Sequence, residues 1–300
     1  MSWTQWPGRL GLIVIEMRIA TRRSALAMAQ AKKVADLLSE RHPGMSVRFV
    51  EVVTEGDRDT TGDIAALTEI GAFVTAVQEA VLDGRADMAV HSLKDLPVSG
   101  GPEPLVLAAF PERVAPFDVL VGRSLDDMPP GSTVGTGSPR RSAQLKDIRP
   151  DVHTVGLRGN VDTRVRKVEE GEVDGAVLAE AGLDRLGLSD RIVQRFALDE
   201  MVPAPGQGAL AVETRAGSEA EAVAATLDDP GLRTLLGAER ELLAQTQAGC
   251  RSALGALASW SGDRMRMDLF VDDDRGPRRA TVEAGDLESL VSAGREELGL

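Results

Sequence analysis

The stretch TVGTGSPRRSAQLKDI, residues 133–148, indicates the fold class of this 300-residue chain. A short apolar run at its start predicts a strand over Thr133–Thr136, and a helical pattern over Pro139–Ile148 follows at once. Ser138 is a hydroxyl N-cap and Pro139 fits the first helical position, so the helix start is well marked. A strand that leads directly into a helix is the building unit of α/β proteins.

The same alternation extends in both directions from this stretch. Arg18–Ala20 predicts a strand, Ser24 caps a helix that runs to about Glu40, and Met88–Ser92 predicts a buried strand. Largely parallel sheets are therefore expected. Further strands are expected at 47–53, 119–122, 153–155, 176–178 and 209–213, and further helices at 72–83 and 161–170.

The last quarter of the chain has a different character. Helices are expected at Ser218–Leu227 and Arg233–Ala248, and apolar residues recur at every second position over 265–271, as Met265, Met267, Leu269 and Val271. This alternation favours antiparallel strands, with a closing helix from Asp286. Thr54–Ile70 is polar, contains two glycines and five acidic residues, and predicts a mobile loop.

Composition excludes several classes of protein. With 43% hydrophobic residues the chain can bury a sizeable core, and its net charge of −13 argues against nucleic acid as a partner. The single cysteine, Cys250, excludes an internal disulfide framework and fits a reducing compartment. The three histidines lie far apart, so no zinc motif is present. No apolar run is long enough for a membrane helix, and a cytoplasmic location is expected. Residues 1–17 are expected to form an N-terminal extension.

One segment of this acidic chain is strongly basic. Residues 138–167 contain eight basic and three acidic residues. Such a block is often no more than a solvated helix face. Its placement favours a binding site, because Arg140 and Arg141 would lie at the positive end of a helix dipole, where an anion would offset their charge. Arg158 and Arg164 flank a second expected helix start, so the sequence indicates a pocket for several carboxylates or phosphates.

A second dense segment is Ala89–Pro97, in which a buried strand ends before Lys94 and Asp95. The pair could be an ordinary solvated ion pair in a turn, or a carboxylate for acid–base work with a lysine beside it. Cys250 is most simply a small buried hydrophobe, and its position near a helix C-terminus does not favour a thiolate.

Five segments together resemble one family, the porphobilinogen deaminases (hydroxymethylbilane synthases). They are RIATRRS (18–24), AVHSLKDLP (89–97), VGTGSPRRSAQL (134–145), LRGN with Thr163 and Arg164 (157–164), and PAPGQGALAVE (203–213). Glu239, Arg240 and Cys250 also fall where that family has its third-domain helix and its cofactor cysteine.

The resemblance implies an α/β fold of two lobes like those of type II periplasmic binding proteins, plus a small α+β C-terminal domain. The implied domains are 18–109 with 209–224, 110–208, and 225–300. The implied reaction joins four porphobilinogen molecules into hydroxymethylbilane and releases four ammonia, as part of tetrapyrrole (haem) biosynthesis. A dipyrromethane cofactor, held by a thioether to Cys250, primes the chain, and the family pattern favours a monomer.

The resemblance also implies roles for individual residues. Asp95 matches the catalytic aspartate, which stabilises the cation formed when ammonia leaves. Thr54–Ile70 would be a lid that shields the reaction from water. The implied cofactor ligands are Ser92, Lys94, Thr136, Ser138, Arg140 and Arg141, and the implied ligands of the substrate and growing chain are Arg22, Ser24, Arg158, Arg164, Arg185 and Gln207.

Two other functions are compatible with the residues themselves. A non-catalytic bilobal module that binds a dicarboxylate would use the same arginines, and fold alone does not separate it from the enzyme. A thiol enzyme based on Cys250 is weaker, because no histidine accompanies the cysteine in the sequence.

Overall fold

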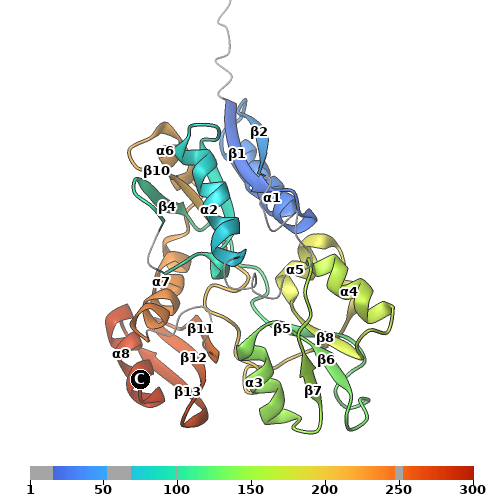
Figure 1. Cartoon of the computed structure of the whole chain (residues 1–300). Coiled ribbons are helices and arrows are strands. Elements are labelled where there is room, and N and C mark those ends of the chain that lie inside the picture. Colours follow the sequence, from blue (N-terminus) through green and yellow to red (C-terminus); the bar gives the residue numbers. More distant parts are fainter. Residues whose placement is uncertain (1–15, 53–68, 99–100, 247–252) are drawn as a thin grey trace, which may run out of the picture.

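Three separate β-sheets organise the molecule (Figure 1). This computed structural model describes residues 16–52, 69–98, 101–246 and 253–300, with side chains in the second range described from Val74 onward. Two of the sheets have five strands and the third has three. Each sheet forms the centre of its own part of the molecule.

The first sheet has the strand order β2-β1-β3-β10-β4. Strand β1 pairs in parallel with β2 and β3, whereas β10 runs antiparallel to both of its neighbours, β3 and β4. The bounds are β1 (Glu16–Arg22), β2 (Ser46–Val52), β3 (Met88–Ser92), β4 (Leu105–Ala109) and β10 (Leu210–Arg215), with helices α1 (Ala25–Arg41), α2 (Glu69–Leu82) and α6 (Glu219–Ala225) around them.

The second sheet has the order β7-β6-β8-β5-β9. Strand β6 is parallel to β7 and β8, and β5 is antiparallel to β8 and β9. The bounds are β5 (Asp118–Gly122), β6 (Thr133–Gly135), β7 (His153–Val155), β8 (Gly175–Ala179) and β9 (Ile192–Arg195), with helices α3 (Pro139–Ile148), α4 (Val161–Glu169) and α5 (Glu180–Leu186).

The two sheets share one topology. In each, the fourth strand in spatial order is antiparallel, and that strand is the first one formed after the chain has crossed from the other lobe. Two lobes with this shared strand order, joined by two crossing segments, confirm the expected fold class, two lobes of the type II periplasmic-binding-protein kind. Helices α1 and α5 contact each other across the junction of the lobes (Figure 1).

The two crossing segments lie side by side. Arg113 on the outward segment forms a β-bridge with Ala209 on the return segment, and the Val114 amide donates to the Gly208 carbonyl at 3.3 Å. Gly208 has φ +85°, and a Cβ there would overlap the carbonyl oxygen of Val114. The close approach of the two segments therefore requires glycine at this position.

The third sheet is antiparallel, with the order β11-β12-β13. Its strands are β11 (Ala253–Ser261), β12 (Arg264–Asp273) and β13 (Gly276–Ala284), and helices α7 (Pro230–Gln245) and α8 (Leu287–Leu298) pack on it. Helix α7 lies between this sheet and the first lobe (Figure 1). It thus connects the C-terminal part of the chain to the lobe above it.

Most elements lie where the sequence predicts them. Helix α3 has exactly the expected bounds, and the side chain of Ser138 accepts a hydrogen bond from the Arg141 amide, as an N-cap does. Helix α2 begins at Glu69, three residues before the expected start, so the last two residues of the predicted loop belong to it. The rest of that loop, residues 54–68, lies outside the described residues. Three short elements, β4, α5 and β9, were not predicted.

Among the residues that the structure describes, no helix is both long enough and apolar enough to cross a bilayer.

Candidate functional site

The candidate site lies where parallel strands of both lobes end. Strand β3 leads into the 3-10 turn η3 (Leu93–Asp95), and β6 leads through Thr136 into the N-terminus of α3. The carboxyl ends of parallel strands are the usual place for ligands in α/β sheets. The two segments carry Lys94, Asp95, Arg140 and Arg141, which the sequence predicted to act together.

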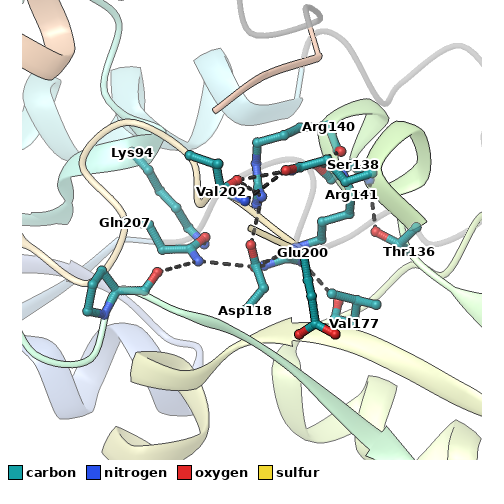
Figure 2. A network of polar contacts seen from close by, with 12 residues as sticks. Lys94, Asp118, Thr136, Ser138, Arg140, Arg141, Val177, Glu200, Val202 and Gln207 are labelled. Atoms are coloured by element: carbon teal, nitrogen blue, oxygen red, sulfur yellow. Dashed lines mark hydrogen bonds and ion pairs between the residues drawn. The ribbon is translucent and has the colours of Figure 1, made fainter. Parts of the chain in front are cut away.

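Asp118 is the centre of this site, at the first residue of β5 (Figure 2). Arg140 Nη1 donates to its Oδ2 at 2.7 Å, and Arg141 Nε and Nη2 donate to its Oδ1 at 2.8 and 2.7 Å. Both arginines also donate to backbone carbonyls, Arg140 to Val202 at 2.7 Å and Arg141 to Val177 at 3.0 Å. Two adjacent guanidinium groups are thereby fixed at one helix N-terminus.

Burial makes this cluster electrostatically strong. Asp118 is 0% exposed, and Arg140 and Arg141 are 4% and 6% exposed. Burial alone would raise the pKa of Asp118, but the charges of the two arginines outweigh it and hold this pKa well below its usual range. The carboxylate therefore stays ionised, and its negative charge balances one of the two positive charges beside it.

Lys94 joins the same network from the first lobe. Its Nζ donates to Gln207 Oε1 at 3.3 Å, and Gln207 Nε2 in turn donates to Asp118 Oδ1 at 3.0 Å and to the Pro116 carbonyl at 2.8 Å (Figure 2). Gln207 belongs to the return crossing between the lobes. It thus links the turn after β3 to the arginine cluster of the second lobe.

The surroundings of Lys94 disfavour the charged form of its side chain. Burial, and after it the charge of Arg141, lowers the pKa of Lys94 to about 8, although the carboxylates of Asp95 and Asp118 oppose this shift. An anion bound near Lys94 would reverse the shift, because it favours the charged form.

Asp95 and Arg164 complete the site. Asp95 is exposed, and within the described ranges its carboxylate accepts no hydrogen bond. Arg164, on the first turn of α4, donates to the Gly159 carbonyl at 2.7 Å. Burial and the charge of Arg141 lower the pKa of Arg164, and the charge of Asp95 opposes them, so Arg164 interacts electrostatically with residues of both lobes.

The charges of the site do not cancel. The four cations Lys94, Arg140, Arg141 and Arg164 face the two carboxylates of Asp95 and Asp118. Two positive charges are therefore left over in a largely buried place. Such a donor set fits a ligand that carries several carboxylates.

Comparisons with known proteins agree with this chemistry. The family model described as porphobilinogen deaminase, dipyromethane cofactor binding domain, matches residues 17–223. A porphobilinogen deaminase of Roseiflexus castenholzii is 45% identical over 94% of this chain and 95% of its own length. The chain belongs to the porphobilinogen deaminase family. Porphobilinogen deaminase 1 of Streptomyces coelicolor is 48% identical over 82% of this chain and 79% of its own length.

Membership in this family confirms the function expected from the sequence. The chain is a porphobilinogen deaminase, that is, a transferase that polymerises porphobilinogen in tetrapyrrole biosynthesis on a dipyrromethane cofactor.

Among solved structures, the chain is similar to the methionine-binding protein MetQ, with a TM-score of 0.45 and 14% identity over 71% of this chain and 89% of that one.

Two further residues predicted for the deaminase site lie beside the arginine cluster. Thr136 Oγ1 accepts from the Ser138 amide at 3.2 Å, and the Ser138 hydroxyl caps α3. In the first lobe, the Ser92 hydroxyl accepts from Gln30 Nε2 at 2.6 Å. These three side chains shape the loops that carry the cations, and their contacts with the cofactor stay a prediction.

The predicted substrate ligands of the deaminase are distributed over both lobes. Arg22 ends β1 and is half-buried, Ser24 caps α1 by accepting from the Ala27 amide at 3.3 Å, and Arg158 is exposed before α4. Each follows a parallel strand, as the site requires. Their roles as substrate ligands stay predictions.

Arg185 lies at the junction of the two lobes. Its Nη2 donates to the Gly208 carbonyl at 2.8 Å and lies 3.5 Å from Glu112 Oε1, so it binds both crossing segments. Glu112 also lies 3.7 Å from Lys33 on α1. Arg185 thus ties α5 to the junction of the lobes, and its contact with substrate stays a prediction.

Cys250, the predicted site of cofactor attachment, lies outside the described residues, which resume at Ala253. Helix α7 ends at Gln245, earlier than the expected Ala248. In the described parts of the chain, no group of three His, Cys, Asp or Glu residues is placed to hold a metal ion.

Sequence reasoning did not find Asp118 as a site residue. It expected an anion to offset Arg140 and Arg141, and the structure supplies one from within the chain. The only sequence signal is an acidic residue directly before the apolar run Val119–Val121. A single acid at the edge of a strand is too common to be recognised without knowing what faces it.

Proposed function

We propose that this porphobilinogen deaminase joins four porphobilinogen molecules into hydroxymethylbilane at the junction of the two lobes, with Asp95 as its catalytic carboxylate. The observation that carries the proposal is the unbalanced cation cluster beside an exposed carboxylate. Porphobilinogen has one acetate and one propionate, so each added ring brings two more negative charges. A site with excess positive charge suits such a growing polyanion.

The cations divide into two groups by how firmly they are held. Arg140 and Arg141 are fixed by Asp118 and by backbone carbonyls, which suits a ligand that stays bound through every cycle. We assign the cofactor carboxylates to these two arginines, to Lys94 and to the Ser92, Thr136 and Ser138 loops. When bound through Cys250, the dipyrromethane supplies the pyrrole carbon that receives the first substrate ring.

The incoming ring and the growing chain are assigned to residues on both lobes and on the crossing segments between them. These are Arg22, Ser24, Arg158, Arg164, Arg185 and Gln207. Arg164 is the member with direct structural support, since its electrostatic partners include both Arg141 and Asp95. It would hold a substrate carboxylate between the cofactor end and the catalytic end of the site.

Asp95 stabilises positive charge in this scheme. In each condensation a C–N bond of the substrate breaks and ammonia leaves, so positive charge develops on the substrate pyrrole. A C–C bond then forms between the methylene carbon that lost ammonia and the free α-carbon of the terminal ring of the chain, and that ring carbon loses its proton. An ionised carboxylate close to the ring nitrogen lowers the energy of the cation and can carry these protons. The exposure of Asp95 leaves its oxygens open to such a ring.

The competing function is a non-catalytic module that binds a dicarboxylate with the same cations. Intact-mass measurement of the protein purified from cells separates the two. The deaminase is expected to exceed its sequence mass by two pyrrole units and to release ammonia from porphobilinogen. A protein with the bare sequence mass that also fails to acquire this mass from porphobilinogen contradicts the proposal.

We also propose the division of the chain into residues 18–109 with 209–224, 110–208 and 225–300, after an extension over 1–17. The three separate sheets support it. The enzyme is further proposed to act as a cytoplasmic monomer without nucleic-acid or membrane partners. Its single cysteine and net charge of −13 support this proposal, and light scattering tests the monomer.

A further inference from the structure

Helix α7 of the C-terminal part contacts the turn that carries Lys94 and Asp95. Leu236 is fully buried and packs in one cluster with Leu93 and Leu96, the residues on either side of that pair. One helical turn later, Arg240 Nη1 donates to the Leu96 carbonyl at 3.3 Å and its Nη2 donates to the Pro97 carbonyl at 2.8 Å. Residues four apart share one helix face, so a single face of α7 holds the turn.

The contact made by Arg240 is unusual for an arginine. A guanidinium at a domain contact commonly pairs with a carboxylate, as Arg113 does with Glu239, but Arg240 donates to two neutral carbonyls. Burial lowers its pKa, and the charge of Glu213, a fully buried residue of β10, opposes that shift. The Arg240 side chain is half-buried, and its two hydrogen bonds fix the path of the backbone that it binds.

The turn itself contains little that would fix it from within. Its internal backbone bond runs from the Leu96 amide to the Leu93 carbonyl at 3.1 Å, and the Leu93 amide donates to Ala209 of the return crossing at 3.0 Å. Strand β3 ends at Ser92, so the turn itself has no place in the sheet. The two bonds from Arg240 therefore hold the side of the turn on which Asp95 lies.

We infer that Arg240, supported by Leu236, is a positioning residue of the deaminase: it sets the placement of Asp95 through the backbone of Leu96 and Pro97. The inference rests on the proposed role of Asp95. It also means that the part of the chain bearing Cys250 sets the geometry of the catalytic carboxylate in the first lobe. A misplacement of about 1 Å at a reacting group can cost on the order of a hundredfold in rate.

The chain offers a matched control on the same helix. Arg233 also reaches from α7 into the first lobe and donates to two backbone carbonyls, those of Leu107 and Ala108, at 3.2 and 3.0 Å. These carbonyls belong to β4, away from the Asp95 turn. Arg233→Met and Arg240→Met each remove two guanidinium–carbonyl bonds between α7 and the lobe. Arg233→Met also removes the ion pair with Asp228 and the contact with the Phe110 ring, so it is the more severe change for the α7 contact, and only Arg240→Met releases the turn.

The test compares the cofactor-loaded forms of Arg240→Met, Arg240→Lys and Arg233→Met, with loading checked by intact mass and folding by thermal unfolding. We expect Arg240→Met to lower kcat at least about tenfold with KM for porphobilinogen unchanged. Arg240→Lys, which keeps one donor to the Pro97 carbonyl, should recover part of kcat. Arg233→Met should lower the unfolding temperature and leave kcat within twofold of the unmodified enzyme.

Three results would overturn the inference. The first is a loaded Arg240→Met enzyme with unchanged kcat, and the second is an equal kcat loss in Arg233→Met, which would show a merely structural contact. The third is normal turnover in Asp95→Asn, which overturns the proposed role of Asp95 and this inference with it. Inactive Asp95→Asn together with fully active Arg240→Met overturns the positioning role alone.

Discussion

The Asp118 carboxylate is fully buried, and it accepts hydrogen bonds from two guanidinium groups and one amide. Three of its donors, Arg140, Arg141 and Gln207, come from segments that sequence analysis assigned to the ligand. A buried carboxylate of this kind orients the cations before any ligand arrives. The ligand then meets donors whose geometry is already fixed, so less conformational freedom is lost on binding.

Replacing Asp118 by asparagine should therefore lower both the free energy of unfolding and the fraction of protein that carries the cofactor. The substitution leaves two buried guanidinium groups without their carboxylate, which costs about 3–5 kcal/mol when a buried pair is broken. We expect a matching loss in denaturant unfolding and a protein without the two-pyrrole mass. Asp36→Asn, on the exposed face of α1, is the control and should change neither quantity. A stable, fully loaded Asp118→Asn protein would contradict this account.

Asp95→Asn is expected to give the opposite result. The exposed side chain contributes little to packing, so folding and cofactor loading should remain, whereas turnover should fall by at least about a hundredfold, the usual range for loss of a general acid–base group. Product formation from porphobilinogen, measured on enzyme of confirmed mass, checks this. Turnover close to that of the unmodified protein would exclude Asp95 from the proposed role.

Lys94 gives the site a pH dependence. Its pKa in the folded protein is about 8, below the value of about 10.4 in an unfolded chain. Between these values the unfolded chain binds more protons, so folding stability rises with pH while the folded site loses a positive charge. Loading of cofactor-free protein with porphobilinogen should therefore fall as pH rises through 8. In Lys94→Arg, which keeps its charge, the decline in the loaded fraction should be absent, and an identical decline in both proteins would count against this explanation.

At the level of single residues, the sequence predicted the polar side chains in dense motifs but not the distant residues that form ion pairs with them. Lys94, Arg140, Arg141 and Gln207 stand in dense motifs, and the structure brings all four into one network. Asp118 and Arg113 stand in ordinary surroundings, and their roles depend on which distant segments face them. Contacts between residues far apart in the chain have no local sequence signal.

Among the elements, those with complete start signals were predicted most closely. Ser138 and Pro139 mark the first turn of α3, and its bounds were exact. The missed elements are short: β9 is a half-exposed edge strand of four residues, and α5 has seven residues with Gly182 among them. Such segments have too few apolar positions to show a period, and tertiary contacts decide their conformation.

The paired crossing segments can be tested through their glycine. Gly208→Ala places a Cβ against the Val114 carbonyl at φ +85°, so we expect a loss of more than about 2 kcal/mol, from backbone strain and displacement of the neighbouring strand together. Gly217→Ala is the matched control, because Gly217 has φ +72° and open space around it. Its loss should be limited to about 1–2 kcal/mol. Equal losses in chemical denaturation would show that the close approach is unimportant.

At the scale of the whole molecule, Glu239 joins three parts of the chain. Its fully buried carboxylate accepts from Arg113 Nη1 at 2.6 Å, from the Gly206 amide at 2.7 Å and from the Ala258 amide at 2.8 Å. These donors lie on the outward crossing, on the return crossing and on β11. One side chain of α7 thus holds the C-terminal sheet against both connections between the lobes.

Glu239→Gln should weaken the contacts between the three parts of the chain more than it weakens the folding of any one part. The substitution leaves the Arg113 guanidinium buried without its carboxylate, a loss of about 3–5 kcal/mol. We expect calorimetry to show the C-terminal part unfolding separately, ahead of the two lobes. Glu241→Gln, two positions further at an exposed site, should unfold like the unmodified protein. A single, unshifted transition in Glu239→Gln would contradict the proposed junction.

The two-lobed architecture was predicted through the family resemblance and not through periodicity. Residue patterns gave strands and helices, but they did not show that β10, formed by residues 210–215, would enter the first sheet between β3 and β4. Strand order depends on which edges remain open when each segment arrives. That information belongs to the assembled sheet and is absent from any single segment.

The position of β10 has a consequence for how the protein is made on the ribosome. When residues up to Ala109 have left the exit tunnel, the first sheet has four of its five strands, and the gap between β3 and β4 is still open. The missing strand is translated only after every strand of the second sheet. The nascent N-terminal lobe must therefore wait, with an unfilled interior edge, until the lobe synthesised after it has emerged.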